Sequence, residues 1–189
     1  MSQYTREEIH QKINEGASLK GADLSKIDLS YEILKNVDLE GVNLSYAHLQ
    51  NANLEDANLK GANLEGAFFF GAHLKNACFD GANLKDANLQ DTNLENVSFK
   101  DANMEHISLF GAVMEGTIFD GANMMRARMK RASLRHASLV NTNLQKAHIE
   151  RAELIQSNLL NADLQGAHAI NTNFEGTDLS QANTKGLKR

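Results

Sequence analysis

A chain of 189 residues with a formal net charge of −5 is long enough to bury one hydrophobic core, and it is too weakly charged to imply strong attraction to nucleic acid or to a membrane surface. The single cysteine, Cys78, excludes an internal disulfide and is typical of a reducing compartment. Residues 1–16 are charged throughout and lack the apolar stretch of a signal peptide, and no apolar run reaches membrane-spanning length. We therefore expect a cytoplasmic protein, with export without a leader left open.

The first predicted element is a short helix over residues 6–15. Thr5 is a suitable N-cap, and Glu8 stands where a capping box places its acidic partner. Ile9 and Ile13 are four residues apart, so they share one helix face. We expect this face to cover the first turn of the structure that follows, because an open β-stack exposes unpaired backbone at its ends.

A repeat of five residues occupies nearly all of the remaining chain. From Leu19 to Leu179 every fifth residue is large and apolar, Ala169 excepted, and a small residue stands two positions before most of them. A period of five fits neither a helix nor a strand and indicates a stacked repeat. We divide the chain into a capping segment (residues 1–16), the repeat region (17–184) and a short tail (185–189).

The repeat unit, as in Ala57-Asn58-Leu59-Lys60-Gly61, resembles the pentapeptide-repeat family. The resemblance implies an all-β solenoid: a right-handed quadrilateral β-helix of about eight coils, with four units in each coil. It also implies that the central residue and the small residue two before it point inward, while the other three positions face outward.

Charges 20 residues apart test the four-unit coil independently of the resemblance. Residues in stacked coils would lie about 4.8 Å apart, so opposite charges at this spacing would be neighbours. One outward column alternates in sign at every step: Lys20, Glu40, Lys60, Asp80, Lys100 and Asp120. A neighbouring outward column partly repeats this alternation until Glu115 interrupts it.

Two further columns predict stacked side chains. Phe79, Phe99 and Phe119 stand at inward centres 20 residues apart, so we expect an aromatic stack inside the rod. An outward column of amides is expected to form hydrogen bonds along the axis. This column is Asn43, Asn63, Asn83, Asn103, Asn123 and Asn143.

Both ends of the repeat raise questions. Glu32 stands at a position that should hold a small inward residue, and we interpret it as a local distortion beside the cap rather than as a functional buried acid. No C-terminal helix is predicted. Either the last coil frays, or it pairs end to end with another copy of the chain.

The pattern of reactive side chains predicts no enzyme and no cofactor. Cys78 has no histidine at a neighbouring position, and no serine, histidine and acid set recurs on the outward columns. His148 and His168 are 20 residues apart and could share an ion, but we identify no third ligand and expect no metal site.

Two outward clusters are candidates for partner binding. Exposed aromatic side chains are expected at Phe68, Phe70 and Phe110, although Phe68 could instead fold over a corner, or these residues could result from neutral drift. A basic cluster could dock an acidic partner or be an ordinary solvated surface. It comprises Arg126, Arg128, Lys130, Arg131 and Arg151, with Arg135 and Lys146 nearby.

These observations favour a non-enzymatic, rod-shaped bacterial scaffold that binds a protein partner of unknown identity, with no direct nucleic-acid binding and no membrane association. The alternative, implied by the resemblance, is a DNA mimic that binds DNA gyrase and gives quinolone or toxin tolerance. Counted over the three outward positions of each unit, no side of the rod is strongly acidic. The sides centred on Leu19 and Leu34 have a net charge of −3 each, and those centred on Leu24 and Leu29 have 0 and +1.

Overall fold

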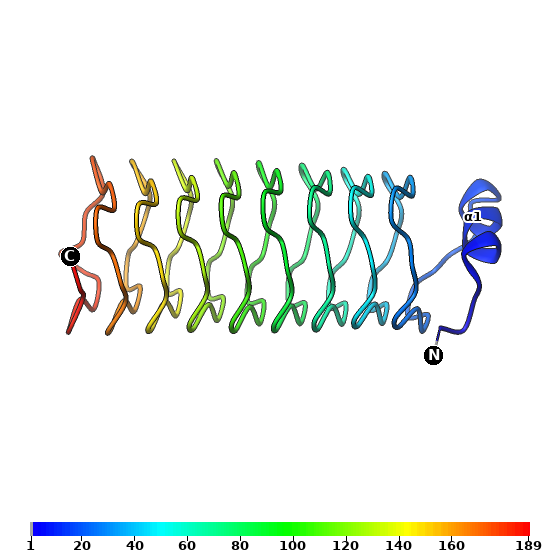
Figure 1. The fold of residues 1–189 in the computed structure, drawn as a ribbon, viewed down its shortest axis with the longest axis horizontal. Coiled ribbons are helices and arrows are strands. Elements are labelled where there is room, and N and C mark those ends of the chain that lie inside the picture. Colours follow the sequence, from blue (N-terminus) through cyan, green and yellow to red (C-terminus); the bar gives the residue numbers. More distant parts are fainter. Residues whose placement is uncertain (1) are drawn as a thin grey trace.

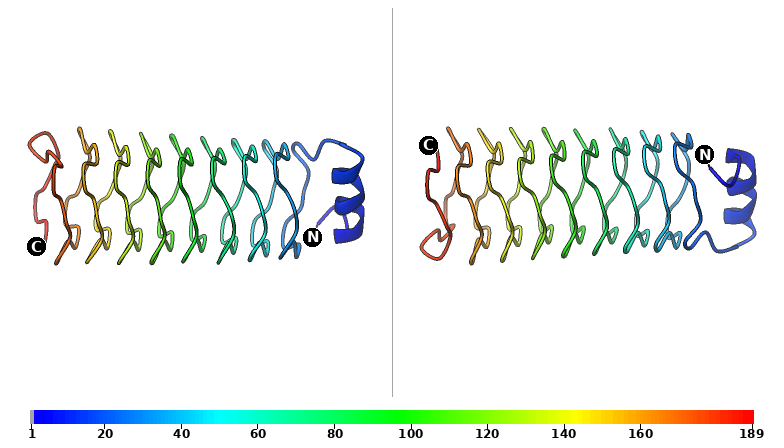
Figure 2. Two further views of the ribbon diagram at one scale, coloured as in Figure 1. Left: turned by 90° about the horizontal axis from the view of Figure 1, so that it is seen from above. Right: turned by 90° about the horizontal axis from the view of Figure 1, so that it is seen from below.

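The computed structural model describes residues 2–189, which form one helix, α1 (Arg6–Asn14), followed by an elongated solenoid (Figure 1). Isolated parallel β-bridges join residues 20 apart, from Asp23–Asn43 through to His168–Lys188. Each coil therefore contains 20 residues, or four five-residue units. The described residues contain no strand longer than such a bridge. Helix α1 and the C-terminus lie at opposite ends of the rod (Figures 1 and 2).

Every unit but one turns the chain at the second residue after its centre, where the backbone has a positive φ; Gln181 is the exception. Twelve of the 13 glycines occupy this position, and asparagine and aspartate are frequent at the others, while the remaining glycine, Gly16, follows the C-cap of α1. These residue types tolerate the left-handed region best, as a type II turn requires. At Gly61, with φ +62°, the turn is closed by a hydrogen bond of 3.1 Å from the amide of Ala62 to the carbonyl of Leu59.

Backbone hydrogen bonds hold each coil to the next. The amide of Leu64 donates to the carbonyl of Asn83 at 2.7 Å, and the amide of Asn83 donates to the carbonyl of Ala62 at 2.9 Å. The same pair of bonds recurs around the rod. The backbone amides and carbonyls of neighbouring coils thus act as hydrogen-bond partners for each other.

The interior contains the predicted aromatic stack. Phe79 and Phe99 stack with ring centroids 4.9 Å apart, and Phe99 and Phe119 follow at 5.4 Å. All three side chains are fully buried. At the small inward position, Thr117 keeps its hydroxyl satisfied by donating to the carbonyl of Leu94 at 2.6 Å. The interior is therefore a continuous apolar column, and the buried hydroxyl of Thr117 has a hydrogen-bond partner within it.

The predicted amide ladder is also confirmed. Each asparagine donates from its Nδ2 atom to the Oδ1 atom of the residue one coil earlier, at 3.0 to 3.3 Å, from Asn143 back to Asn43. The ladder ends on Asp23, to which Asn43 donates at 2.9 Å. A carboxylate suits this position because it only accepts hydrogen bonds.

The alternating charges form fewer ion pairs than predicted. Lys20 pairs with Glu40 at 2.8 Å, but no ion pair within 4.0 Å joins the later members of that column among the described residues. Asp80 and Asp120 instead accept from the hydroxyls of Ser98 and Ser138 and from main-chain amides of the next coil. The shorter aspartate side chain stays near the backbone, whereas glutamate reaches across to lysine.

Helix α1 caps the first coil as expected. The predicted capping box between Thr5 and Glu8 is present, and Ile9 is fully buried. The helix ends one residue earlier than predicted, with Glu15 as its C-cap. Its apolar face replaces the coil that would otherwise lie below the first turn.

The interpretation of Glu32 as a local distortion is wrong. Its amide makes the standard turn hydrogen bond to the carbonyl of Leu29 at 3.1 Å, so the backbone is regular there. The carboxylate is nearly buried and binds α1, with Oε1 2.8 Å from Nδ1 of His10 and Oε2 3.3 Å from Nε of Arg6. The large side chain fits because the first coil has no coil beneath it.

The C-terminal end has no comparable cover within the described residues. Phe174, Leu179 and Leu187 pack against the core but remain partly exposed. The coil register continues into the segment that we set apart as a tail, because the amide of Ala169 donates to the carbonyl of Lys188 at 2.6 Å. The last coil is therefore paired on one side and open on the other.

Candidate partner-binding wall

One side of the rod carries the predicted aromatic residues. Phe68 and Phe70 flank the buried Phe69, and Phe70 and Phe110 are 48% and 39% exposed. Ile170, also exposed, lies further along the same column. We call this side, including its two corners, the aromatic-basic wall. Its inward centres are Leu29, Leu49, Phe69, Leu89, Leu109, Met129, Ile149 and Ala169.

The predicted basic residues belong to the same wall. Arg128 and Lys130 stand on it, and Arg131 and Arg151 lie at the corner that follows. Arg126 lies at the corner that precedes it. In the sequence the aromatic and basic clusters form separate surfaces, and the 20-residue register joins them. The Cζ atom of Arg131 lies 5.9 Å from the centroid of the Phe110 ring, which is a cation–π distance.

The guanidinium groups of this wall are not neutralised by the chain itself. Within residues 2–189, Arg126, Arg128, Arg131 and Arg151 form no ion pair within 4.0 Å. Arg135 differs, because it lies on the next wall and binds Glu153 at 2.8 Å. Of the predicted basic cluster, Lys130 is paired with Glu150, and the four arginines form no ion pair among residues 2–189.

An open cavity of about 410 Å³ lies where the two clusters meet. Phe110, Lys130, Arg131, Glu150 and Arg151 line it. The cavity therefore combines an aromatic ring, three cations and one carboxylate.

The carboxylate of Glu150 is held on one side of this cavity. Its Oε1 atom lies 3.2 Å from Nζ of Lys130 and 3.3 Å from Nδ1 of His148, while the buried Oε2 atom has no hydrogen-bond partner. Burial alone would raise the pKa of Glu150, but the hydrogen bonds, including those from His148 and Lys130, outweigh it and lower the pKa. Glu150 is therefore ionised at neutral pH and is already compensated by its neighbours.

His148, Glu150 and His168 lie close enough to hold a metal ion, so the structure supplies a third ligand that is not evident from the sequence. Two lysines compete for these ligands. Lys130 occupies the carboxylate, and Nζ of Lys188 lies 3.1 Å from Nε2 of His168. Burial, together with the charges of Lys188 and His148, lowers the pKa of His168. The Glu150 carboxylate and the His168 ring therefore each already have a lysine partner within the chain.

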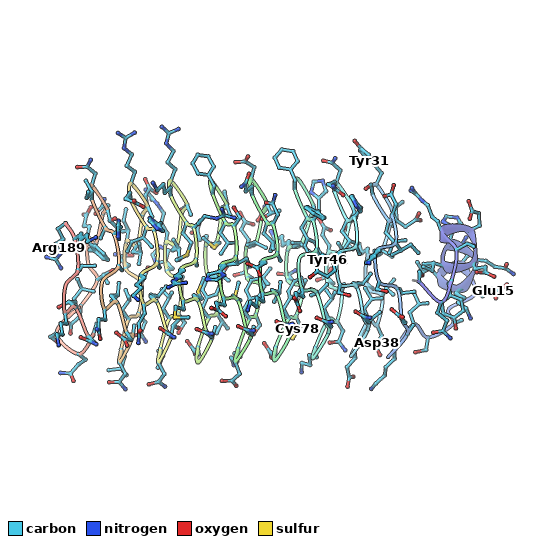
Figure 3. All side chains as sticks on the ribbon, turned by 60° about the horizontal axis from the view of Figure 1, so that its bottom comes forward. Glu15, Tyr31, Asp38, Tyr46, Cys78 and Arg189 are labelled. Carbon is cyan, nitrogen blue, oxygen red and sulfur yellow. The ribbon has the colours of Figure 1, made fainter. Side chains whose placement is uncertain are left out.

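Sequence reasoning missed other parts of this wall. The rings of His48 and Phe68 stack at 5.1 Å. Tyr31 and Tyr46 project from its corners (Figure 3), where their backbone has a positive φ. With Phe68, Phe70, Phe110 and Ile170 they make six of the nine exposed large hydrophobic residues among residues 2–189. The sequence contained a signal for these two tyrosines, because each stands at the turn position of its unit, and an aromatic residue in a left-handed turn is unusual.

Cys78 lies on another wall and is half-buried (Figure 3). Burial is the main cause that raises the pKa of its thiol, with the nearby charge of Asp80 acting in the same direction. A thiol with a raised pKa has little thiolate at neutral pH. This environment does not activate a nucleophile.

None of the helices in residues 2–189 has the length and apolar character needed to span a membrane.

Comparison with known proteins identifies the repeat. The family model described as pentapeptide repeats matches residues 38–76, 77–116, 107–145 and 147–183. A solved structure with the same architecture is HetL, a pentapeptide repeat protein involved in heterocyst differentiation regulation from the cyanobacterium Nostoc sp. strain PCC 7120. It is 24% identical over 98% of this chain and 97% of its own, with a TM-score of 0.79. The fold is that of a right-handed β-helix solenoid.

A second solved structure, QnrB1, is a plasmid-mediated fluoroquinolone resistance protein. It is 18% identical over 92% of this chain and 82% of its own, with a TM-score of 0.41. No curated protein matches the chain.

Proposed function

Because the chain belongs to the pentapeptide-repeat family, we propose that it is a non-enzymatic rod of about eight four-sided coils that binds a protein partner through the aromatic-basic wall. In the part of the chain that the structure describes, six of the nine exposed large hydrophobic residues gather on this wall and its corners, beside arginines without ion pairs, and this observation carries the proposal. Buried aromatic and arginine side chains dominate the energetics of most protein interfaces.

The test compares partners captured from the native host by the wild-type chain and by a variant carrying Phe70→Ser and Phe110→Ser. We expect the double variant to lose specific partners. A matched control carries Val113→Ser and Leu160→Ser, which remove exposed apolar side chains from other walls. Retention of every specific partner by the first variant would exclude this wall as the binding site.

The gyrase-binding alternative receives less support from the distribution of charge. A DNA mimic needs an acidic surface along its length, whereas the aromatic-basic wall has unpaired arginines and a net charge of +1 over its outward positions. A supercoiling assay with a quinolone separates the two functions. Protection of gyrase by a several-fold excess of this protein would favour the mimic.

The open C-terminal coil supports a further proposal, an end-to-end homodimer. Phe174, Leu179 and Leu187 are only partly buried there, and within the described residues the outer backbone groups of the last coil face no neighbouring coil. Sedimentation analysis tests this proposal. Leu179→Lys should shift a dimer to a monomer, and a wild-type chain that is monomeric at high concentration would contradict it.

A further inference from the structure

We infer that the cavity beside Phe110 binds an extended acidic peptide segment of a partner protein, with one apolar side chain of that segment placed on Phe110. This inference rests on the proposed function and specifies the chemistry of the partner. The cavity is lined by Phe110, Lys130, Arg131, Glu150 and Arg151.

Like charges are stacked beside the cavity, at Arg131 and Arg151. Elsewhere on the rod, lysines pair with glutamates one coil away, as in Lys35–Glu55 at 2.8 Å. Arg131 and Arg151 are also one coil apart, but both are cations, and neither forms an ion pair among the described residues. The two arginines stand at stacked corner turns, so their like charges repel each other. Carboxylates from a partner would relieve this repulsion and match the planar guanidinium fork.

Apolar side chains lie next to these cations. The Phe110 ring is partly exposed and lies against the guanidinium of Arg131. Ile170 lies in the same column on the far side of Lys130 and Glu150. A nucleic-acid backbone would bind the cations but would leave the apolar surface of Phe110 and Ile170 uncovered. A peptide that alternates acidic and apolar side chains covers both.

The spacing of Phe110, Arg131 and Arg151 along the axis matches that of an extended peptide. Coils are about 4.8 Å apart, so Arg151 lies about 10 Å along the axis from Phe110, with Arg131 between them. An extended peptide rises about 3.3 Å per residue. Two carboxylates within about three positions of an apolar residue can therefore reach both arginines while that residue contacts Phe110.

Glu150 provides a residue whose change should strengthen binding. It is the one carboxylate that lines the cavity, and Lys130 and His148 hold it. Glu150→Gln removes a negative charge beside the site and frees Lys130 for the peptide. A surface that binds acidic peptides must respond to this change with higher affinity.

The experiment measures fluorescence anisotropy of a labelled, terminally capped peptide of about twelve residues, with one phenylalanine flanked by aspartates among glycines and serines, in about 50 mM salt. We expect binding by the wild-type protein, and a loss of affinity of about ten-fold or more in a variant carrying Arg131→Gln and Arg151→Gln. The matched control, Arg135→Gln on the next wall, should bind like the wild type. Glu150→Gln should bind several-fold more tightly.

Three results would overturn the inference. These are no binding at peptide concentrations up to about 1 mM, equal binding of a peptide in which serine replaces the phenylalanine, and tighter binding of an oligothymidylate of the same length. The proposed function is tested separately by the Phe70→Ser and Phe110→Ser variant. If native partners depend on those two residues while the acidic peptide does not bind, the proposed partner-binding wall stands and the inference of an acidic partner segment is wrong.

Discussion

The Oε1 atom of Glu32 lies 2.8 Å from Nδ1 of His10, and this contact joins the first coil of the rod to the helix that caps it. Arg6 completes the junction through its Nε atom and through a hydrogen bond of 2.7 Å from its guanidinium to the carbonyl of Ser30. A nearly buried carboxylate thus receives two partners from α1. The cap is held by polar contacts at its edge and by Ile9 at its centre.

Glu32→Ala should lower the free energy of unfolding by about 1–3 kcal/mol, because it leaves the groups on α1 without their acceptor. Thermal or urea unfolding at neutral pH measures this. Glu40→Ala is the control, because Glu40 and Lys20 form an exposed pair that contributes little. An equal loss in both variants would contradict a special role for Glu32.

The stabilisation from Glu32 should also depend on pH. Burial raises its pKa, but hydrogen bonds and charges from His10 and Arg6 outweigh burial, so the folded-state pKa is lowered. A carboxyl with a lowered folded pKa stabilises the protein above its unfolded pKa of about 4.3, and this contribution is lost as the pH falls through the folded value. The stability difference between wild type and Glu32→Gln should therefore shrink below about pH 4. A constant difference down to acid unfolding would disagree with this linkage.

Phe99→Ala should lower the free energy of unfolding by about 3–5 kcal/mol, because it removes a fully buried ring from the middle of the aromatic stack. This loss is larger than the one expected for Glu32→Ala. Phe99→Leu should cost less, since it leaves a smaller void. Urea unfolding measures both. Phe110→Ala serves as the comparison, and a similar loss there would show that burial does not set the cost.

Asn103→Ala should lower stability by about 1–2 kcal/mol. It removes the hydrogen bond that Asn103 donates to Asn83 and the bond that it accepts from Asn123. Asn103→Asp should fall between the wild type and the alanine variant, because a carboxylate still accepts but cannot donate. Denaturant titration ranks the three proteins, and the reverse order of the two variants would exclude the ladder as the cause.

Cys78 should react slowly with a disulfide reagent at neutral pH, since burial raises the pKa of its thiol and the thiolate is the reactive form. We expect a rate below that of glutathione at pH 7, rising through the alkaline range. The unfolded chain in urea is the control and should react at the rate of an ordinary thiol. A folded-state rate above that of glutathione would indicate an activated cysteine.

The amino-acid sequence by itself determined the repeat, its coil length and the inward columns. Turns every five residues favour glycine, asparagine or aspartate at the left-handed position, and the narrow interior needs alternating small and large apolar residues. These requirements are local and recur in every unit, so the period shows them directly. The stacks of Phe79, Phe99 and Phe119 and the asparagine ladder follow from the same 20-residue register.

Side-chain length and the presence or absence of a neighbouring coil decided what the period could not. Asp80 turned to the backbone instead of to lysine, because its side chain is short. Glu32 reached α1 because no coil lies beneath it. Phe110, Arg131 and Glu150 came together in one cavity because two adjoining columns meet at a corner. Contacts of this kind depend on reach and direction in three dimensions, and only the tertiary structure fixes both.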